Sequence, residues 1–141
     1  MREIKFRGKT KQGKWVYGYY LPWHAVKTED RADVYAQIFE EKDEKHAKGW
    51  VFVKANTVGQ YTGLKDKNGV EIYEGDIVRT EKRRVCKVVW FSSNAHCGFD
   101  LLPLEDKNPA PSASSIWKPE NIEVIGNIYD NPELLKVEVE E

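Results

Sequence analysis

The feature that most constrains the fold of this chain is a two-residue alternation of side chains, broken by turns that contain glycine. Ile4 and Phe6 alternate with charged neighbours, and residues 15–21 are rich in the aromatic and β-branched types that favour strands. Similar short segments recur roughly every 8 to 12 residues, without the intervening helices of a βαβ chain. The pattern predicts a mainly β protein built from antiparallel strands.

The order of these segments predicts where the strands lie. Residues 3–7 and 15–21 flank a polar stretch with two glycines, so we expect them to form an N-terminal hairpin. Residues 50–53 form a short apolar strand. Three strands of a meander are then expected at residues 76–80, 85–91 and 98–104, followed by a further strand at residues 122–128.

Residues 33–48 fit two patterns. Val34 and Ile38 have the spacing of a helical stripe, whereas the odd-numbered side chains at residues 35–39 alternate as in a strand. We favour a strand through residues 36–39, followed by a charged loop, and a helix is the alternative.

Two tight turns in the middle of the chain mark the start of a second subdomain. Asn68 and Gly69 are residue types that accept positive φ angles, and Gly75 and Asp76 form a second turn that leads into a strand.

Later in the chain, the Pro- and Ser-rich residues 105–115 predict an exposed loop, and Asn131 with Pro132 predicts a helix start. We therefore expect a mixed, mostly β N-terminal subdomain in residues 1–60, a small antiparallel barrel in residues 61–135 and an acidic tail in residues 136–141.

Composition excludes several classes of protein. The 141 residues are 40% apolar and include 17 aromatic residues, enough to fill a core. The 22 Lys and Arg nearly balance the 23 Asp and Glu, which removes any whole-molecule attraction to nucleic acid or to a membrane surface. The chain has neither a membrane-spanning apolar run nor a signal peptide, and two cysteines suit a reducing compartment, so we expect a soluble, cytoplasmic protein.

Three segments together resemble a known family. They are REIKFRG at Arg2–Gly8, VGQYTGLKDKNGVEIYEGDIV at Val58–Val78 and EVIGNIYDNPELL at Glu123–Leu135. In this order they resemble the YopX family of phage and prophage proteins. The resemblance implies a protein encoded by temperate phages or prophages, present in the bacterial host cell, with an SH3-like barrel in its C-terminal part. It implies no established biochemical activity and no catalytic residues.

The polar residues near the second turn are better explained by structure than by catalysis. Glu74 and Asp76 would form a carboxylate pair for acid–base chemistry or for a metal, but Gly75 between them favours a turn whose amides Asp76 binds. The glycines of the central segment lack the spacing and the following helix of a phosphate-binding loop; they are Gly59, Gly63 and Gly69.

Cysteine and histidine do not form a zinc pattern either. The soft ligand types are present, but no C-x2-C or H-x3-H pair occurs among them; they are Cys86, His96, Cys97, His24 and His46. Adjacent residues of a strand point to opposite faces, which also argues against a His96–Cys97 catalytic dyad. We therefore expect no enzymatic activity, no metal and no other cofactor.

A basic run with nearby tryptophans offers an alternative function. Small β-barrels hold single-stranded nucleic acid through phosphate contacts and base stacking. The residues of such a site would be Arg79, Lys82, Arg83, Arg84, Lys87, Trp90 and Trp117. A charged hairpin tip that remains in solvent explains the same run, and the net charge of -1 lacks the basic excess of nucleic-acid-binding domains. Nucleic acid is therefore the second hypothesis.

The first hypothesis is a non-catalytic module that binds a protein partner or a second copy of itself. Its basis is a cluster of aromatic residues in one segment, more than a single strand of a small domain buries: Trp15, Tyr17, Tyr19, Tyr20 and Trp23. We expect this segment to pair edge-to-edge with a copy of itself and to give a homo-oligomer.

Overall fold

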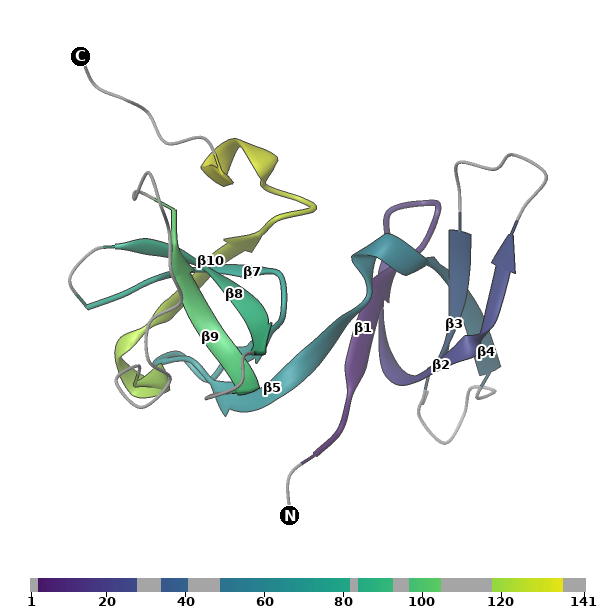
Figure 1. The fold of residues 1–141 in the computed structure, drawn as a ribbon, viewed down its shortest axis with the longest axis horizontal. Helices are drawn as coiled ribbons and strands as arrows, with labels where there is room; N and C mark the ends of the chain where they lie inside the picture. Colours follow the sequence, from purple (N-terminus) through teal and green to yellow (C-terminus); the bar gives the residue numbers. More distant parts are fainter. Residues whose placement is uncertain are drawn as a thin grey trace. The chain divides into compact units, whose positions relative to one another are not determined.

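The chain divides into two compact units, Met1–Tyr61 (unit 1) and Thr62–Glu141 (unit 2). A computed structural model describes residues 3–27, 34–40, 49–81, 84–92, 97–104 and 118–135 (Figure 1). These residues form antiparallel strands and short 3-10 helices, and no α-helix occurs among them. The prediction of a mainly β fold is confirmed.

Unit 1 is built on a sheet whose strand order is β4-β3-β2-β1-β5. The strands are β1 (Phe6–Lys9), β2 (Trp15–Lys27), β3 (Val34–Glu40), β4 (Gly49–Lys54) and β5 (Gly59–Lys65), with the 3-10 helix η1 (Ala55–Thr57) between the last two. The expected N-terminal hairpin is β1 and β2, and the expected strands at residues 36–39 and 50–53 lie within β3 and β4. The helical alternative is wrong for residues 34–40, and residues 41–48 lie outside the described part of the chain.

The core of unit 1 lies on one face of this sheet, which we call the inner face. Val16, Ala36, Ile38 and Val53 are fully buried there, and they come from β2, β3 and β4. Glycine allows the strands to approach: a Cβ on Gly8 would lie 2.6 Å from Cγ2 of Val53. Strand alternation therefore leaves the opposite face of β1 to β4 without a role in this core.

A buried threonine holds η1 against the first strand. The Thr57 hydroxyl donates to the carbonyl of Lys54 at 2.7 Å and accepts from the amide of Lys9 at 2.8 Å. One side chain thus satisfies backbone groups on two segments that are far apart in the sequence.

Unit 2 contains the continuation of β5, which lies beside β6 (Glu71–Tyr73), and a second sheet of order β10-β7-β8-β9. The strands of that sheet are β7 (Asp76–Arg79), β8 (Val85–Ser92), β9 (Cys97–Pro103) and β10 (Glu123–Asn127). The expected meander is therefore confirmed as β7, β8 and β9, with β10 returning beside β7. Neither sheet closes on itself among the described residues, so the expected barrel is not confirmed.

The core of unit 2 packs between these strands and Ile122, which follows the 3-10 helix η3 (Pro119–Asn121). Its fully or nearly fully buried members are Ile72, Val78, Cys86, Val88, Leu101 and Ile122. The expected helix start near Asn131 is the 3-10 helix η4 (Pro132–Leu135). The side-chain oxygen of Asn131 accepts from the amide of Asn127 at 3.2 Å, so it braces the preceding turn. The predicted loop at residues 105–115 and the acidic tail at residues 136–141 lie outside the described residues.

The turn between β6 and β7 depends on Gly75. Its φ angle is +91°, its amide donates to the carbonyl of Val88 at 2.9 Å, and its carbonyl accepts from the amide of Ile128 at 2.9 Å. A Cβ at this position would lie 3.2 Å from Cε2 of Tyr129. The position therefore requires the left-handed backbone conformation that favours glycine, and a side chain here would also press against Tyr129.

We expect Gly75→Val to destabilise unit 2 by about 2 to 3 kcal/mol, because a β-branched residue is strained at positive φ and contacts Tyr129. Gly69→Val is the matched control, since Gly69 has a φ of +80° but no atom within 4 Å of its Cβ position. Strain alone should cost about 1 to 2 kcal/mol there. Urea denaturation followed by circular dichroism measures both losses, and an unchanged stability of Gly75→Val would contradict the role of this turn.

Candidate functional site

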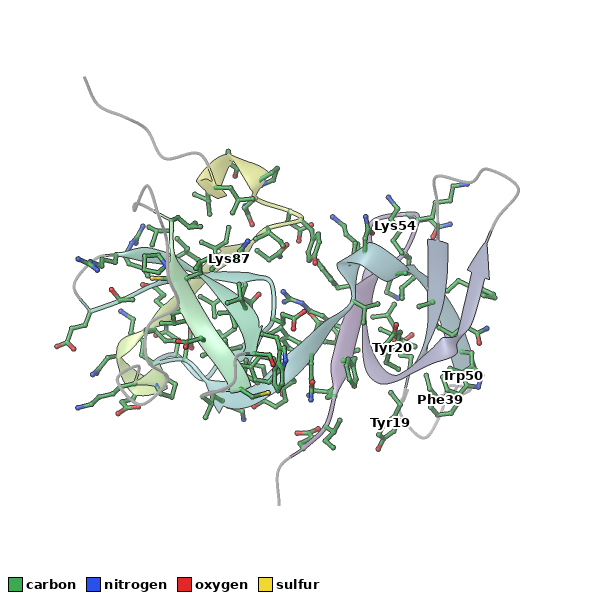
Figure 2. All side chains as sticks on the ribbon, viewed as in Figure 1. Tyr19, Tyr20, Phe39, Trp50, Lys54 and Lys87 are labelled. Atoms are coloured by element: carbon green, nitrogen blue, oxygen red, sulfur yellow. The ribbon has the colours of Figure 1, made fainter. Side chains whose placement is uncertain are left out.

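The face of β1 to β4 opposite the core, which we call the outer face, carries a row of aromatic side chains. Strand pairing sets Tyr19 of β2 opposite Phe39 of β3, and Phe39 opposite Trp50 of β4. Figure 2 shows these three side chains next to one another at one end of the sheet. We call them the aromatic row.

Two members of the aromatic row are open to solvent, and Phe39 between them is partly buried. Tyr19 is 58% exposed and Trp50 is 44% exposed. The Phe39 and Trp50 rings meet edge to face with centroids 4.9 Å apart. Phe52 and Tyr17 lie on the same face and are exposed by 50% and 44%. Contiguous exposed aromatic side chains of this kind mark interaction surfaces more often than they stabilise a fold.

Cations line the first strand on the same outer face. The guanidinium carbon of Arg7, a residue that is only 6% exposed, lies 4.7 Å from the centroid of the Trp15 ring, and Nζ of Lys9 lies 5.9 Å from it. Nζ of Lys5 lies 5.2 Å from the Tyr61 ring centroid and 3.7 Å from Oε1 of Glu3. Positive groups thus lie over aromatic rings on this face, as cation–π pairs do.

The acidic residues of these strands do not lie on the outer face. In β1 to β4 the one acidic residue is Glu40, which follows Phe39 and therefore points to the inner side. Lys54 of β4 alternates with Phe52 and adds a further cation to the outer face, at the end of β4 away from Trp50 (Figure 2). The outer face therefore combines aromatic rings with positive charge.

The two units carry opposite net charges. Residues 1–61 contain 12 Lys and Arg against 8 Asp and Glu, a net charge of +4. Residues 62–141 contain 10 Lys and Arg against 15 Asp and Glu, a net charge of -5. The net charge of -1 for the whole chain is the sum of these two values and conceals a basic unit 1.

The predicted aromatic cluster of residues 15–23 is divided between two faces. Trp15, Tyr17 and Tyr19 lie on the outer face, but Tyr20 packs against the inner core, with its ring centroid 5.3 Å from that of Phe6. The side chain of Trp23 lies outside the described residues, although its backbone belongs to β2.

The sheet order bears on the predicted edge-to-edge pairing of this segment, which stays a prediction. Strand β2 lies between β1 and β3; it pairs with β1 from Trp15 to Gly18 and with β3 from Gly18 to Leu21. Because β2 is an internal strand of the described sheet, its exposed side chains are the part of the segment that is open to a partner.

The predicted basic hairpin is not brought together with its tryptophan. Arg79 and Lys87 lie on one face of the β7–β8 pair, since Ile77 is opposite Lys87 and Arg79 is opposite Val85. Trp90 is three residues beyond Lys87 and so lies on the other face, where its ring meets that of Phe99 edge to face at 4.9 Å. Arg84 is exposed at the hairpin end, whereas Lys82, Arg83 and Trp117 lie outside the described residues.

The predicted turns are present, and they depend on a residue that the sequence analysis missed. Oδ1 of Asp66 accepts from the amides of Asn68 at 2.8 Å and Val70 at 2.9 Å, and Oδ2 accepts from the amide of Val124 at 2.9 Å. Asp66 therefore closes the Asn68–Gly69 turn and attaches it to β10. An Asp two residues before Asn-Gly is a known turn signal that would have identified it.

Asp76 has the structural role expected of it. Its Oδ2 accepts from the amide of Tyr73 at 2.7 Å, and the side chain is 1% exposed. Among the expected sulfur ligands, Cys86 is buried in the core and Cys97 is exposed. His46, His96 and the His24 side chain lie outside the described residues, in which no cluster of metal-binding groups occurs.

Two carboxyl groups of unit 2 have shifted pKa values. Burial acts to raise the pKa of Asp66, but the amides of Val124, Val70 and Asn68, together with the charge of Lys67, lower it below its ordinary value. Burial raises the pKa of Glu74. Both groups lie in turns, where hydrogen bonding and desolvation explain the shifts.

A comparison with known protein families matches residues 5–136 to the family described as YopX protein. The chain belongs to the YopX family. A comparison with curated proteins finds no match. This YopX-family chain is also similar to a crystal structure of protein EF1440 from Enterococcus faecalis, with 21% identity over 96% of this chain and 100% of that chain, at a TM-score of 0.43. None of the helices in the described ranges has the length and apolarity to cross a membrane.

The lowered pKa of Asp66 predicts a loss of stability in acid. Because the folded-state pKa lies below the unfolded value of about 3.9, the ionised carboxylate stabilises unit 2 above that pH. This contribution is lost as the pH falls from about 4 through the folded-state pKa. We expect urea denaturation to show a steeper decline below about pH 4.5 for the natural chain than for Asp66→Asn.

Glu74→Gln is the control with the opposite sign. Its raised pKa means that ionisation opposes folding, so neutralising it should leave the stability at pH 7 unchanged or increased. Equal pH profiles for the natural chain and Asp66→Asn would contradict the role assigned to the Asp66 carboxylate.

Proposed function

We propose that this protein is a non-catalytic binding module whose contact surface is the outer face of the unit 1 sheet. The observation that carries the proposal is the aromatic row, which is exposed although the core on the inner face is complete without it. Half-exposed rings contribute little to the stability of the fold, and a contiguous exposed aromatic patch is typical of a surface that binds a partner.

Membership of the YopX family supports a proposal about the biological setting in which this module acts. In line with the resemblance, we propose an accessory protein of a phage or prophage that acts in the cytoplasm of the bacterial host. The SH3-like arrangement of unit 2 stays a prediction from the same resemblance.

Self-association is a second candidate, and the opposite charges of the two units favour it. Unit 1 of one copy, at +4, would attract unit 2 of another copy, at -5. Light scattering at high micromolar concentration measures the mass directly. A mass above that of one chain which falls as salt is added supports this candidate, and a single-chain mass throughout excludes it.

We expect replacement of the aromatic row to change stability little. In the double variant Tyr19→Thr/Trp50→Thr, the β-branched residue keeps the strand preference and removes the rings. The combined loss should stay below about 2 kcal/mol, since the lost terms are partial burial and one ring contact.

The control is Ile38→Ala on the inner face, where a fully buried side chain is lost and about 2 to 5 kcal/mol is expected. Urea denaturation compares the two variants. A double variant as unstable as Ile38→Ala would mean that the row is structural, and the proposed function would then be wrong.

A further inference from the structure

We infer that the partner of the outer face is a single-stranded nucleic acid. This inference rests on the proposed function, because it names the ligand of the same surface. Such a ligand presents flat bases and a negatively charged backbone. Proteins bind it without sequence readout through aromatic rings on which bases stack and cations that follow the phosphates. The outer face has both chemistries on one sheet.

The aromatic row provides the stacking surface. Tyr19, Phe39 and Trp50 lie on three adjacent strands, and neighbouring strands lie about 4.8 Å apart, so the row is roughly 10 Å long. This length accommodates about two or three bases, as on other sheets that hold single strands. Phe52 extends the ring surface along β4.

The cations lie where a backbone beside these bases would pass. Lys5 precedes β1, and Lys9 follows on the same side of that strand, next to β2 with its tyrosines, whereas Arg7 between them is buried. Lys54 lies beyond Phe52 on β4. Glu40, the acidic residue of strands β1 to β4, points to the inner face, so the opposing charge is Glu3, whose Oε1 lies 3.7 Å from Nζ of Lys5.

The charge of the outer face favours a nucleic acid over an apolar protein surface as its partner. A purely apolar patch would suit a protein surface, but here Lys5, Lys9 and Lys54 lie on the same face as the rings. A polyanion gains from these charges, and its bases gain from the rings. The basic hairpin of unit 2 lacks this combination, because Lys87 and Trp90 lie on opposite faces.

The structure offers a closely matched control for the stacking residue. Trp50 and Trp90 are 44% and 49% exposed, and each meets a Phe ring edge to face with centroids 4.9 Å apart. They differ in the unit that holds them. Lys54 and Lys87, both half-buried strand residues labelled in Figure 2, form the corresponding pair of cations.

The experiment is a fluorescence anisotropy titration of a labelled single-stranded oligothymidylate, about 20 nucleotides long, with the full chain. We expect saturable binding that weakens with added salt, with a slope of log K against log salt of about -2 for three phosphate contacts. A duplex of the same length should bind more weakly, because its bases are already stacked.

The variants assign the binding to the outer face. Trp50→Thr should weaken binding about 5- to 100-fold, the range expected for the loss of one stacked base. Lys54→Gln should reduce the salt slope by about 0.7. Trp90→Thr and Lys87→Gln should leave both quantities unchanged.

Three results would overturn the inference. Binding that Trp90→Thr weakens as much as Trp50→Thr would place the site elsewhere. Absence of binding, together with an increased mass in light scattering that Trp50→Thr abolishes, would make a second copy the partner and leave the proposed function intact. Absence of binding by a single-chain protein would exclude the nucleic acid. The proposed function itself is tested separately: it is wrong if Tyr19→Thr/Trp50→Thr is as unstable as Ile38→Ala.

Discussion

Unit 1 depends on the alternation of side chains along paired antiparallel strands. The register sets Val16, Ala36, Ile38 and Val53 on one face, and a shift of one residue in any strand would move its apolar side chains to the other face. A second constraint fixes the spacing, since a Cβ on Gly18 would overlap the carbonyl oxygen of Phe39. Packing in the core thus determines which residue types the inner face carries, but it does not constrain those of the outer face. That freedom makes the rings and cations found there informative about binding.

Unit 2 uses its polar side chains in another way. Its carboxylates and amides satisfy backbone groups in turns: Asp66 binds three amides, Asp76 binds that of Tyr73, and Oδ1 of Asn127 accepts from the amides of Tyr129 and Asp130. An open arrangement of short strands leaves many such groups without a ladder partner, and each would be costly if buried without one. Asp76, one of the two carboxylates that resemble a catalytic pair in the sequence, therefore stabilises a turn, and the surface chemistry that suits a ligand lies in unit 1.

Local pattern predicted the strands and the glycine turns, because alternation and turn chemistry depend on neighbouring residues. It did not predict which strand is central. Counting aromatic residues along one segment grouped Tyr20 with Tyr19, although alternation sends them to opposite faces, and it omitted Phe39 and Trp50, which only strand pairing brings beside Tyr19. The full role of Asp66 was equally inaccessible, because its third hydrogen-bond partner is 58 residues away. The candidate site is a product of long-range register, which a single sequence does not contain.

The net charge of the whole chain does not decide what one of its surfaces binds. A value of -1 argues against nucleic acid only if the charges act together, and ions screen exposed charges beyond about 8 to 10 Å in physiological salt. A bound strand senses the few cations within that distance of its phosphates. On the outer face these are Lys5, Lys9 and Lys54, with Glu3 beside Lys5 as the opposing charge, whereas Arg7 is buried. Rings and cations on a sheet do not read base edges, so binding of this kind tolerates many sequences, and its strength depends on salt and on how many bases are unpaired.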